Sequence, residues 1–310
     1  MKKLFTSIIT MMVLTVSIKI GVYSFDNNDD FKKIFSDSDI REEYFYDVLD
    51  IVKDEAYLYK NELAGVKDSI LSIFADAEEV GKNSYYYDHL TEKEKRIYEK
   101  LYYHASRFNL NPFVLTLNES EDVYYKFMLD YPEFYWVNNN NSQVSRNEVF
   151  IASECSYDKE EVKKTYQEIV NKAEDIVKDI LDYSDYEKVK YIYDYVIKHV
   201  VYISGSENNQ DIRSSLLNGK SVCAGYSGMF KFLCDKASID CLSVFGKTNP
   251  DRGIYHEWNC VKVDGNYYWV DVTWDDGHKT YKYFLKSDED FFKTHTLVFD
   301  YGYPVCETNY

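Results

Sequence analysis

Three short stretches in the C-terminal third of this 310-residue chain carry residue types that together can activate a thiol. They are G-K-S-V-C-A-G-Y at 219–226, H-E-W-N at 256–259 and Y-W-V-D-V-T-W-D-D at 268–276. Within them, Cys223, His256 and Asp271 supply a nucleophile, a base and an acid that orients the base. The chemistry that this set predicts is acyl transfer through a thioester on Cys223.

The cysteine is expected at the start of a helix. The run from Val222 to about Lys236 has apolar residues at helical spacing, and Ser221 is a candidate N-cap. Cys223 then falls in the first turn, where unpaired backbone N–H groups favour a thiolate and are placed to stabilise an oxyanion. Gly225 and Gly228 each cost this helix about 1 kcal/mol relative to alanine, which predicts close packing or access beside the cysteine.

A predicted β-hairpin brings the histidine and the aspartate together. The Asp264–Gly265 pair is a strong signal for a two-residue turn between β-rich runs at 256–263 and 267–273. Counting outward from this turn makes His256 and Asp271 diagonal neighbours on one face, about 7 Å apart at the backbone. A three-residue turn without a bulge would put them on opposite faces, so the register tests the prediction.

Two other residues are candidates for the site. Trp258 is expected on the same face as His256, where it is a candidate wall of the substrate channel, with core packing as the alternative. Gln210 precedes Cys223 by thirteen residues, and its amide is a candidate oxyanion donor, with a solvated loop position as the alternative. The Asp275–Asp276 pair is interpreted as solvated surface.

These motifs resemble the transglutaminase-like superfamily, whose members carry a Cys-His-Asp triad related in geometry to that of papain-type thiol proteases. The likeness is carried by Val222 to Tyr226, His256 to Asn259 and Val270 to Asp275, and extends more softly over roughly residues 90–310. It is strongest to secreted members from Gram-positive bacteria. By this resemblance Cys223 is the nucleophile, His256 the base and Asp271 its orienting partner. Ala224 and Glu257 stand where other small or acidic residues are common.

The resemblance implies a reaction in two stages on a protein or peptide substrate, such as a cell-wall peptide. The thiolate attacks an amide carbonyl, an amine leaves after protonation by His256, and a thioester remains on Cys223. Water as the second nucleophile makes a peptidase or amidase, whereas a lysine amine makes a cross-linking transglutaminase. Hydrolysis is favoured, because no extra domain that would exclude water is recognisable. A non-catalytic module that binds proteins or cell-wall polymers is the alternative from another class.

The N-terminus has the layout of a signal peptide. Lys2 and Lys3 precede an apolar run over residues 4–18, which is short for a membrane span, and a small residue near position 24 suits cleavage. We therefore expect residues 1–24 to be removed on export. The product is a secreted or extracellular protein, free or loosely associated with the cell wall, with no stable membrane insertion. An uncleaved anchor is the alternative, because Lys19 interrupts the end of the apolar run.

Charge and cysteine content narrow the partners. A formal net charge of −17 argues against nucleic acid and against an anionic membrane surface. No spacing matches a zinc site or an EF-hand, so no metal and no cofactor are expected. The five cysteines other than Cys223 are an odd number, so at least one more is free, and their pairing cannot be deduced from sequence. They are Cys155, Cys234, Cys241, Cys260 and Cys306. The oligomeric state is left open.

The rest of the chain predicts an α+β fold with helices packed on an antiparallel sheet. Residues 25–88 have a helical pattern and form a spacer or accessory bundle, with a pro-segment as the alternative. Residues 89–310 form the catalytic domain, with a transglutaminase-like (papain-like) core by resemblance. Capping signals at Thr91, Asp158 and Ser184 begin three helices, of which the second runs to about Leu181 and the third to His199. Strand-like runs occur at 133–137, 148–152, 200–203, 241–246, 256–263 and 267–273.

Overall fold

The computed structural model describes residues 84–108, 110, 113–115, 120–137, 143–144, 150–152, 157–248, 253–278 and 280–310. The predicted signal peptide and all but the last five residues of the predicted helical region 25–88 lie outside these described residues. The division of the chain at residues 24 and 88 therefore stays a prediction.

The chain separates into two compact units. The first contains Met1–Val80, Asn111–Ser120 and Asn141–Glu154. Its described residues form a small antiparallel sheet of order β1-β3-β2, with β1 at Phe113–Leu115, β2 at Gln143–Val144 and β3 at Phe150–Ala152. The second unit contains Gly81–Leu110, Glu121–Asn140 and Cys155–Tyr310, and it holds every residue of the candidate site.

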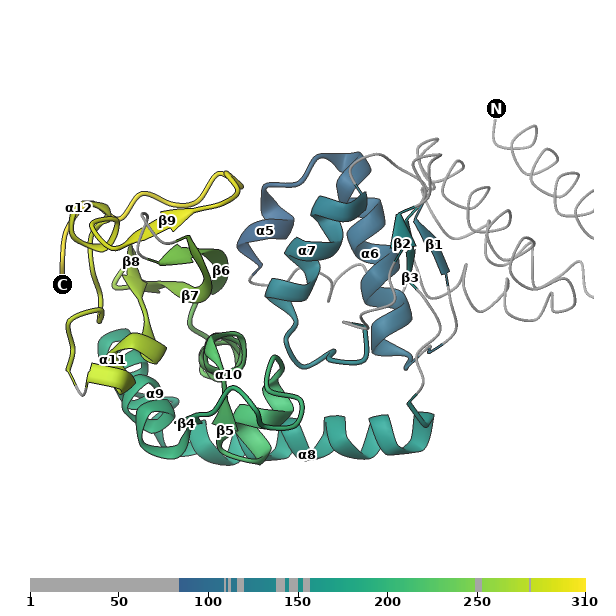
Figure 1. Ribbon diagram of the computed structural model, residues 1–310, viewed down its shortest axis with the longest axis horizontal. Helices are drawn as coiled ribbons and strands as arrows, with labels where there is room; N and C mark the ends of the chain where they lie inside the picture. The colour runs from purple at the N-terminus through teal and green to yellow at the C-terminus, as the bar shows by residue number, and fades with distance from the viewer. Residues whose placement is uncertain are drawn as a thin grey trace, which may run out of the picture. The chain divides into compact units, whose positions relative to one another are not determined.

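The second unit combines helices with a four-stranded sheet (Figure 1). Its helices are α5 (Tyr85–Asp88), α6 (Glu92–Ser106), α7 (Ser120–Asp130), α8 (Lys159–Val177), α9 (Asp185–His199), α10 (Cys223–Lys236), α11 (Val272–His278) and α12 (Asp288–Phe291). A 3₁₀ turn η1 (Lys178–Ile180) follows α8, and a π-helical turn η2 (Arg213–Leu217) precedes α10. The strands are β4 (Val201–Tyr202), β5 (Lys220–Ser221), β6 (Cys241–Thr248), β7 (Ile254–Val263), β8 (Asn266–Val270) and β9 (His295–Leu297).

Side-chain caps begin the helices that the sequence predicted. Thr91 and Ser184 each form a capping box, with Glu94 and Glu187 as the reciprocal partners. Asp158 accepts hydrogen bonds from the backbone N–H groups of the first turn of α8. These three helix starts are confirmed, because a cap is a local interaction that a few neighbouring residues specify.

The main sheet has the order β8-β7-β6-β9, and all its pairs are antiparallel. Val263 pairs with Asn266 across a two-residue turn, as predicted. The turn residues Asp264 and Gly265 have φ values of 51° and 88°, the left-handed conformations that Asp-Gly favours in such turns. The predicted strand 267–273 is wrong beyond Val270, because the chain turns there into α11.

The predicted strand at 133–137 is also wrong. The backbone N–H of Phe134 donates to the carbonyl of Tyr131, and that of Val137 donates to the carbonyl of Phe134, so the segment forms consecutive turns. Its aromatic side chains are buried against helices instead of pairing in a sheet. Aromatic residues favour strands because they pack on a half-buried surface, and here a helical layer provides that surface.

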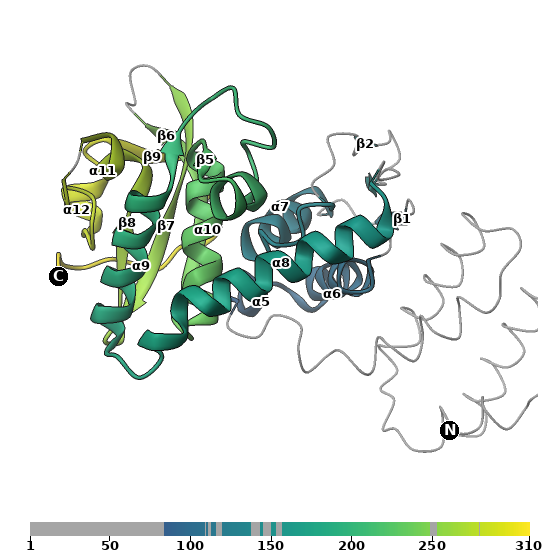
Figure 2. The ribbon, with the colours of Figure 1, turned by 90° about the horizontal axis from the view of Figure 1, so that it is seen from below.

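The sheet is covered on both faces. One face packs a core of Leu242, Val244, Trp258, Cys260 and Trp269 against Tyr283, Phe291 and Cys306 from the C-terminal segments. On the other face, α10 lies alongside β6 and β7 (Figure 2). The Asn259 amide on β7 donates to the carbonyl of Ser227 on α10 at 3.2 Å. The α+β class is confirmed, and this arrangement places the start of α10 beside the first residues of β7, where His256 lies.

Candidate active site

Hydrogen bonds to the preceding loop fix the start of α10. β5 pairs in parallel with β4, and Ser221 Oγ donates to the carbonyl of Asn209 at 2.8 Å. The backbone N–H of Val222 donates to the same carbonyl at 3.1 Å. Ser221 is therefore not the N-cap that the sequence predicted. Val222 occupies that position without a side-chain cap, because the Ser221 hydroxyl holds the preceding loop instead.

Cys223 is the first residue of α10 and is half-buried. The first intrahelical hydrogen bond runs from the N–H of Tyr226 to the carbonyl of Val222, so the N–H groups before Tyr226 have no intrahelical acceptor. Such N–H groups carry partial positive charge at a helix N-terminus and are candidate donors to an oxyanion.

The two glycines of α10 give neighbouring segments room to approach. A Cβ on Gly225 would lie 1.9 Å from Ser221 Oγ, and one on Gly228 would lie 3.0 Å from the Pro132 side chain. The prediction of close packing beside Cys223 is confirmed. The helix tolerates the intrinsic cost of glycine because the loop that precedes it packs directly on its first turn.

His256 lies between Asp271 and Cys223. Its Nε2 is 2.7 Å from Asp271 Oδ2, and its ring is in hydrogen-bonding contact with Cys223, for which Nδ1 remains. Burial opposes protonation of the ring, but the charge and hydrogen bond of Asp271, followed by the contact with Cys223, raise the pKa of His256 from 6.5 to about 10. The arrangement suits an imidazolium that faces a thiolate.

Asp271 has two functions, one for each carboxylate oxygen. Oδ1 accepts the backbone N–H of Trp274 at 3.0 Å and so caps α11, while Oδ2 accepts from His256. Burial alone would raise the pKa of Asp271, but His256 and then His295 hold it well below its usual range. The aspartate is fully buried, and a buried carboxylate stays ionised only where such donors stabilise its charge.

His295 on β9 is a residue of the site to which the sequence analysis gave no role. Its Nε2 lies 3.0 Å from the same Asp271 Oδ2, and its Nδ1 lies 3.0 Å from Thr294 Oγ1. Its ring stacks on Phe291 with the centroids 4.0 Å apart. No local motif marks His295, because β9 reaches the sheet from a distant segment of the chain and pairs with β6.

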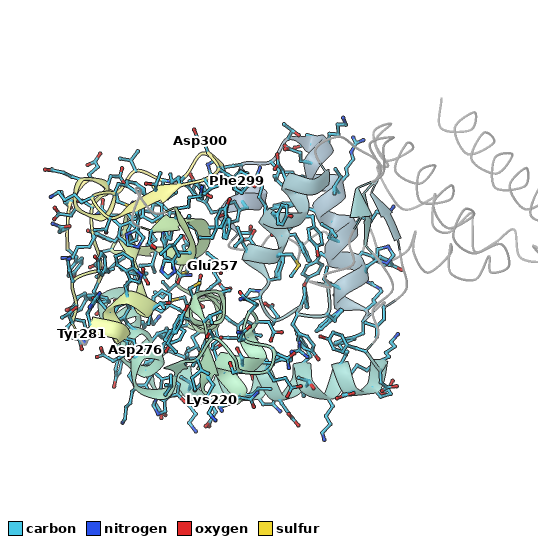
Figure 3. All side chains as sticks on the ribbon, in the orientation of Figure 1. Lys220, Glu257, Asp276, Tyr281, Phe299 and Asp300 are labelled. Atoms are coloured by element: carbon cyan, nitrogen blue, oxygen red, sulfur yellow. The ribbon has the colours of Figure 1, made fainter. Side chains whose placement is uncertain are left out.

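The Asp275–Asp276 pair is buried, so its interpretation as solvated surface is wrong. The Tyr193 hydroxyl donates to Asp275, and the Tyr226 hydroxyl donates to Asp276 at 2.8 Å. Asp276 lies on α11, as Figure 3 shows. The two tyrosines come from α9 and α10, so the pair joins α11 to α9 and to the helix that begins with the nucleophile. A tyrosine partner so far along the chain leaves no sequence signal near the two acids.

The structure separates the other two candidates. Trp258 shares the face of His256, as expected, but it is 1 % exposed and packs in the core against Phe291 and His295. Its ring packs beside the rings of His256 and His295 inside the core, so its assignment as a channel wall is wrong. Gln210 is exposed and lines a cavity together with Ala224, the residue after the nucleophile. Its function as an oxyanion donor stays a prediction.

His256, Asp271 and His295 are also three residues whose donor atoms lie close enough to hold a metal ion, all within 4.8 Å of one another. Two imidazoles and one carboxylate are ligand types that zinc accepts. The hydrogen bonds of Asp271 Oδ2 to both rings already account for this convergence, so the cluster needs no ion to explain it.

The remaining described cysteines are buried and unpaired, namely Cys234, Cys241, Cys260 and Cys306. The sulfurs of Cys260 and Cys306 lie 3.7 Å apart without a bond. Within the described part of the chain, no helix is both long and apolar enough to cross a membrane.

Residues 171–274 match the family description "Transglutaminase-like superfamily", and this stretch contains Cys223, His256 and Asp271. The chain contains a transglutaminase-like domain. Kyphoscoliosis peptidase from Mus musculus is 28% identical over 144 residues, and that from Homo sapiens is 27% identical over 145 residues. These matches cover 40% and 41% of this chain and 22% of each relative, so the chain spans about a fifth of the curated relatives' length.

Two solved structures resemble the chain more distantly. One is a TGase with 16% identity and a TM-score of 0.28, over 40% of this chain and 41% of the other. The second is a candidate cysteine protease from Cytophaga hutchinsonii with 18% identity and a TM-score of 0.28, over 43% of this chain and 61% of the other.

Proposed function

We propose that the protein is an exported thiol enzyme that cleaves peptide or isopeptide amide bonds through a thioester on Cys223. One observation carries the proposal. His256 contacts the half-buried Cys223 at a helix N-terminus while the buried, ionised Asp271 holds its other ring nitrogen. A binding module has no need for a buried carboxylate that stabilises an imidazolium, because such a charge is costly unless it has a use.

The proposed reaction uses each of these groups at a stated atom. The Cys223 sulfur attacks the amide carbonyl carbon, and the backbone N–H groups at the start of α10 stabilise the oxyanion. As the C–N bond breaks, the His256 imidazolium gives its proton to the leaving amine. His256 is then neutral and takes a proton from the second nucleophile, which attacks the thioester and frees the sulfur. Asp271 stays ionised throughout.

Water is the favoured second nucleophile. The curated relatives that match this chain are named peptidases, and that name supports hydrolysis over amine transfer. A protein cross-linking transglutaminase would use the same three residues with a lysine amine as the acceptor, so it remains the second candidate. A non-catalytic module that binds proteins or cell-wall polymers is the third.

The test supplies both acceptors at once. The purified protein is incubated with β-casein and dansylcadaverine, and the products are examined by mass spectrometry. Hydrolysis gives new peptides, whereas amine transfer gives casein that carries the dansyl group. We expect mainly peptides, lost in Cys223→Ala and retained in Cys234→Ala, which removes the other thiol of α10. Dansyl incorporation as the main product would favour the transglutaminase, and no Cys223-dependent product of either kind would favour the binding module.

Export is part of the same proposal. The lysines at 2 and 3 and the apolar run that follows support a cleaved signal, with the mature protein released or loosely held at the cell wall. N-terminal sequencing of the protein from the medium should begin near residue 25. A protein that keeps residues 1–24 and stays with the cell membrane would contradict export and support the uncleaved anchor.

A further inference from the structure

A cavity of about 410 Å³ adjoins the candidate catalytic residues. Its walls include Ala224 and Glu257, which follow Cys223 and His256 directly in the chain. His256 faces Asp271 and the core, so the alternation of β7 turns Glu257 to the opposite face of the sheet, where α10 packs. The cavity lining therefore begins one residue along the chain from the candidate nucleophile and from the candidate base, and neither of these two side chains is part of it.

The cavity is mainly aromatic and apolar. Its rings include Tyr124 and Tyr125 on α7, Phe245 on β6 and Phe299 after β9. Phe245 is paired directly across the sheet with Glu257. Figure 3 shows Glu257 on β7 and Phe299 on the C-terminal segment. No lysine or arginine is among the residues that line the cavity.

Glu257 is the carboxyl of this cavity that lacks a lysine or arginine partner. It accepts a hydrogen bond from Ser227, and His256 is the nearby group that favours its ionised form. Within the described residues, no lysine or arginine forms an ion pair with it. Burial raises the pKa of Glu257 to about 8, because the loss of water outweighs the hydrogen bond of Ser227 and the charge of His256.

Two cations that contact residues of the cavity lining are already engaged. Arg213 pairs with Asp211, the other acid of the lining, at 2.7 Å and lies over the Tyr135 ring. Lys126 lies over the Tyr301 ring at 4.6 Å from its centroid. These contacts show that tyrosines of this region take cations on their faces, and they leave Glu257 to an external one.

We propose that the cavity binds a lysine or arginine side chain of the substrate, with Glu257 as the partner of the charged end. The aromatic walls accommodate the methylene stem, and the strongly negative net charge of the chain favours the approach of a basic peptide. This inference rests on the proposed function and names the substrate class for the same site.

The bound lysine or arginine side chain belongs to the acyl part of the substrate, at the first or second residue before the bond that is cleaved. That part must stay bound while the thioester exists, whereas the leaving side must empty to admit water. A walled cavity that Ala224, the residue after Cys223, helps to line meets the first requirement and would hinder the second.

The test compares lysine with norleucine, which has a similar stem and no charge. The probes are acetyl-Gly-Lys and acetyl-Lys-Gly chloromethyl ketones and their norleucine counterparts, in which the Cys223 sulfur bonds to the methylene carbon and chloride leaves. Intact-protein mass spectrometry gives each alkylation rate. At one of the two positions we expect lysine to react about tenfold faster or more, as a desolvated cation site provides.

Charge-specific variants assign that preference to Glu257. In Glu257→Gln the ratio of the lysine rate to the norleucine rate should fall close to unity. Glu207→Gln removes an exposed acid from the neighbouring loop, outside the cavity lining, and should keep the ratio. Because each ratio is internal to one variant, the intrinsic reactivity of the thiol cancels. A ratio near unity in the unaltered protein, or one that Glu257→Gln leaves unchanged, would overturn the inference.

A binding experiment separates this inference from the proposed function. Iodoacetamide measures the reactivity of Cys223 without using the cavity. The amides acetyl-Gly-Lys-NH₂ and acetyl-Gly-norleucine-NH₂, and the pair with the order reversed, are titrated into Cys223→Ala by NMR, where no thiol is needed. Preferential binding of a lysine amide that depends on Glu257 supports the cavity even if the thiol proves unreactive. If the lysine and norleucine amides bind equally while the Cys223 thiol is reactive, the inference about the cavity is refuted and the proposed function is not.

Discussion

At the scale of single residues, the site depends on Asp271 Oδ2, which accepts from two histidines. His256 reaches the nucleophile, whereas His295 faces only Asp271, Thr294 and the aromatic core. His295 is therefore a positioning residue. It supplies a hydrogen bond that keeps the aspartate ionised and fixed in one orientation.

Replacing His295 by phenylalanine should weaken the site without removing the triad. Loss of a hydrogen bond to a buried charge should cost about 1.5–3 kcal/mol of the free energy of unfolding. It should also reduce the rate at which iodoacetamide modifies Cys223 near neutral pH, because His256 is then held less firmly. The matched control is His295→Gln, whose amide can still donate to Asp271 and should recover part of the rate. Equal rates for both variants would show that His295 contributes packing alone.

The protonation of His256 should make stability depend on pH in one direction. Its pKa is about 10 in the folded protein and 6.5 when unperturbed, so folding favours the imidazolium. The stabilising contribution is full below about pH 6.5 and is lost as the pH rises towards about 10. The advantage in Tm of the unaltered protein over His256→Gln should shrink across that window.

The control for this pH dependence is His278→Gln, which changes an exposed histidine of the neighbouring helix α11. Its Tm should follow that of the unaltered protein at every pH. An advantage over His256→Gln that stays constant, or grows, between these pH values would show that the folded protein does not hold His256 as an imidazolium.

At the scale of secondary-structure elements, the loop before α10 and the first turn of that helix are packed too closely for a side chain at position 225. Alanine normally stabilises a helix by about 1 kcal/mol relative to glycine. At Gly225 the added methyl group would collide with Ser221 Oγ, so we expect Gly225→Ala to lower the free energy of unfolding by about 1–3 kcal/mol.

Gly277 provides the matched control in α11, because an added Cβ meets no other atom within 4 Å. Gly277→Ala should be neutral or stabilising by at most about 1 kcal/mol. Urea titrations of the two variants give the comparison. A Gly225→Ala protein as stable as Gly277→Ala would mean that the loop at Ser221 packs less tightly on α10 than these contacts indicate.

Sequence rules succeeded for elements whose causes are local. The capping boxes at Thr91 and Ser184 and the Asp264–Gly265 hairpin were predictable, because a few adjacent residues determine each of them. The hairpin register in turn placed His256 near Asp271. The end of β8 was missed although Asp271 is a favourable N-cap with an acid in the following turn, a signal that the alternating pattern of the strand concealed.

The parts of the site that sequence did not predict depend on distant segments. His295 reaches Asp271 through β9, and the cavity beside Glu257 is closed by α7 and the segment after β9. Trp258 was placed on the correct face of the sheet. Whether that face meets solvent depends on the elements that cover it, and here α12 and β9 cover Trp258. Such contacts follow from tertiary packing, which a single sequence does not encode in local patterns.

At the scale of the whole molecule, burial should restrict chemical modification in the folded protein to one of the described cysteines. Cys223 is half-buried, whereas the other four are at most 2 % exposed. Mass-spectrometric mapping after brief iodoacetamide treatment of the folded protein should therefore find the label on Cys223. The other four cysteines should be labelled only after the protein is unfolded. Early labelling of Cys260 or Cys306 would show that the C-terminal segment opens readily and would contradict the closed core.

The most direct test of the account is the rate of Cys223 alkylation by iodoacetamide at about pH 6, well below the ordinary thiol pKa of about 8.5. The unaltered protein, His256→Ala and Asp271→Asn are compared, with His278→Gln as the control. If an imidazolium held by Asp271 maintains the thiolate, the unaltered protein and the control react much faster than a free thiol. His256→Ala then loses the enhancement and Asp271→Asn loses most of it. An ordinary rate in the unaltered protein, or an enhancement that survives in His256→Ala, would contradict the central claim.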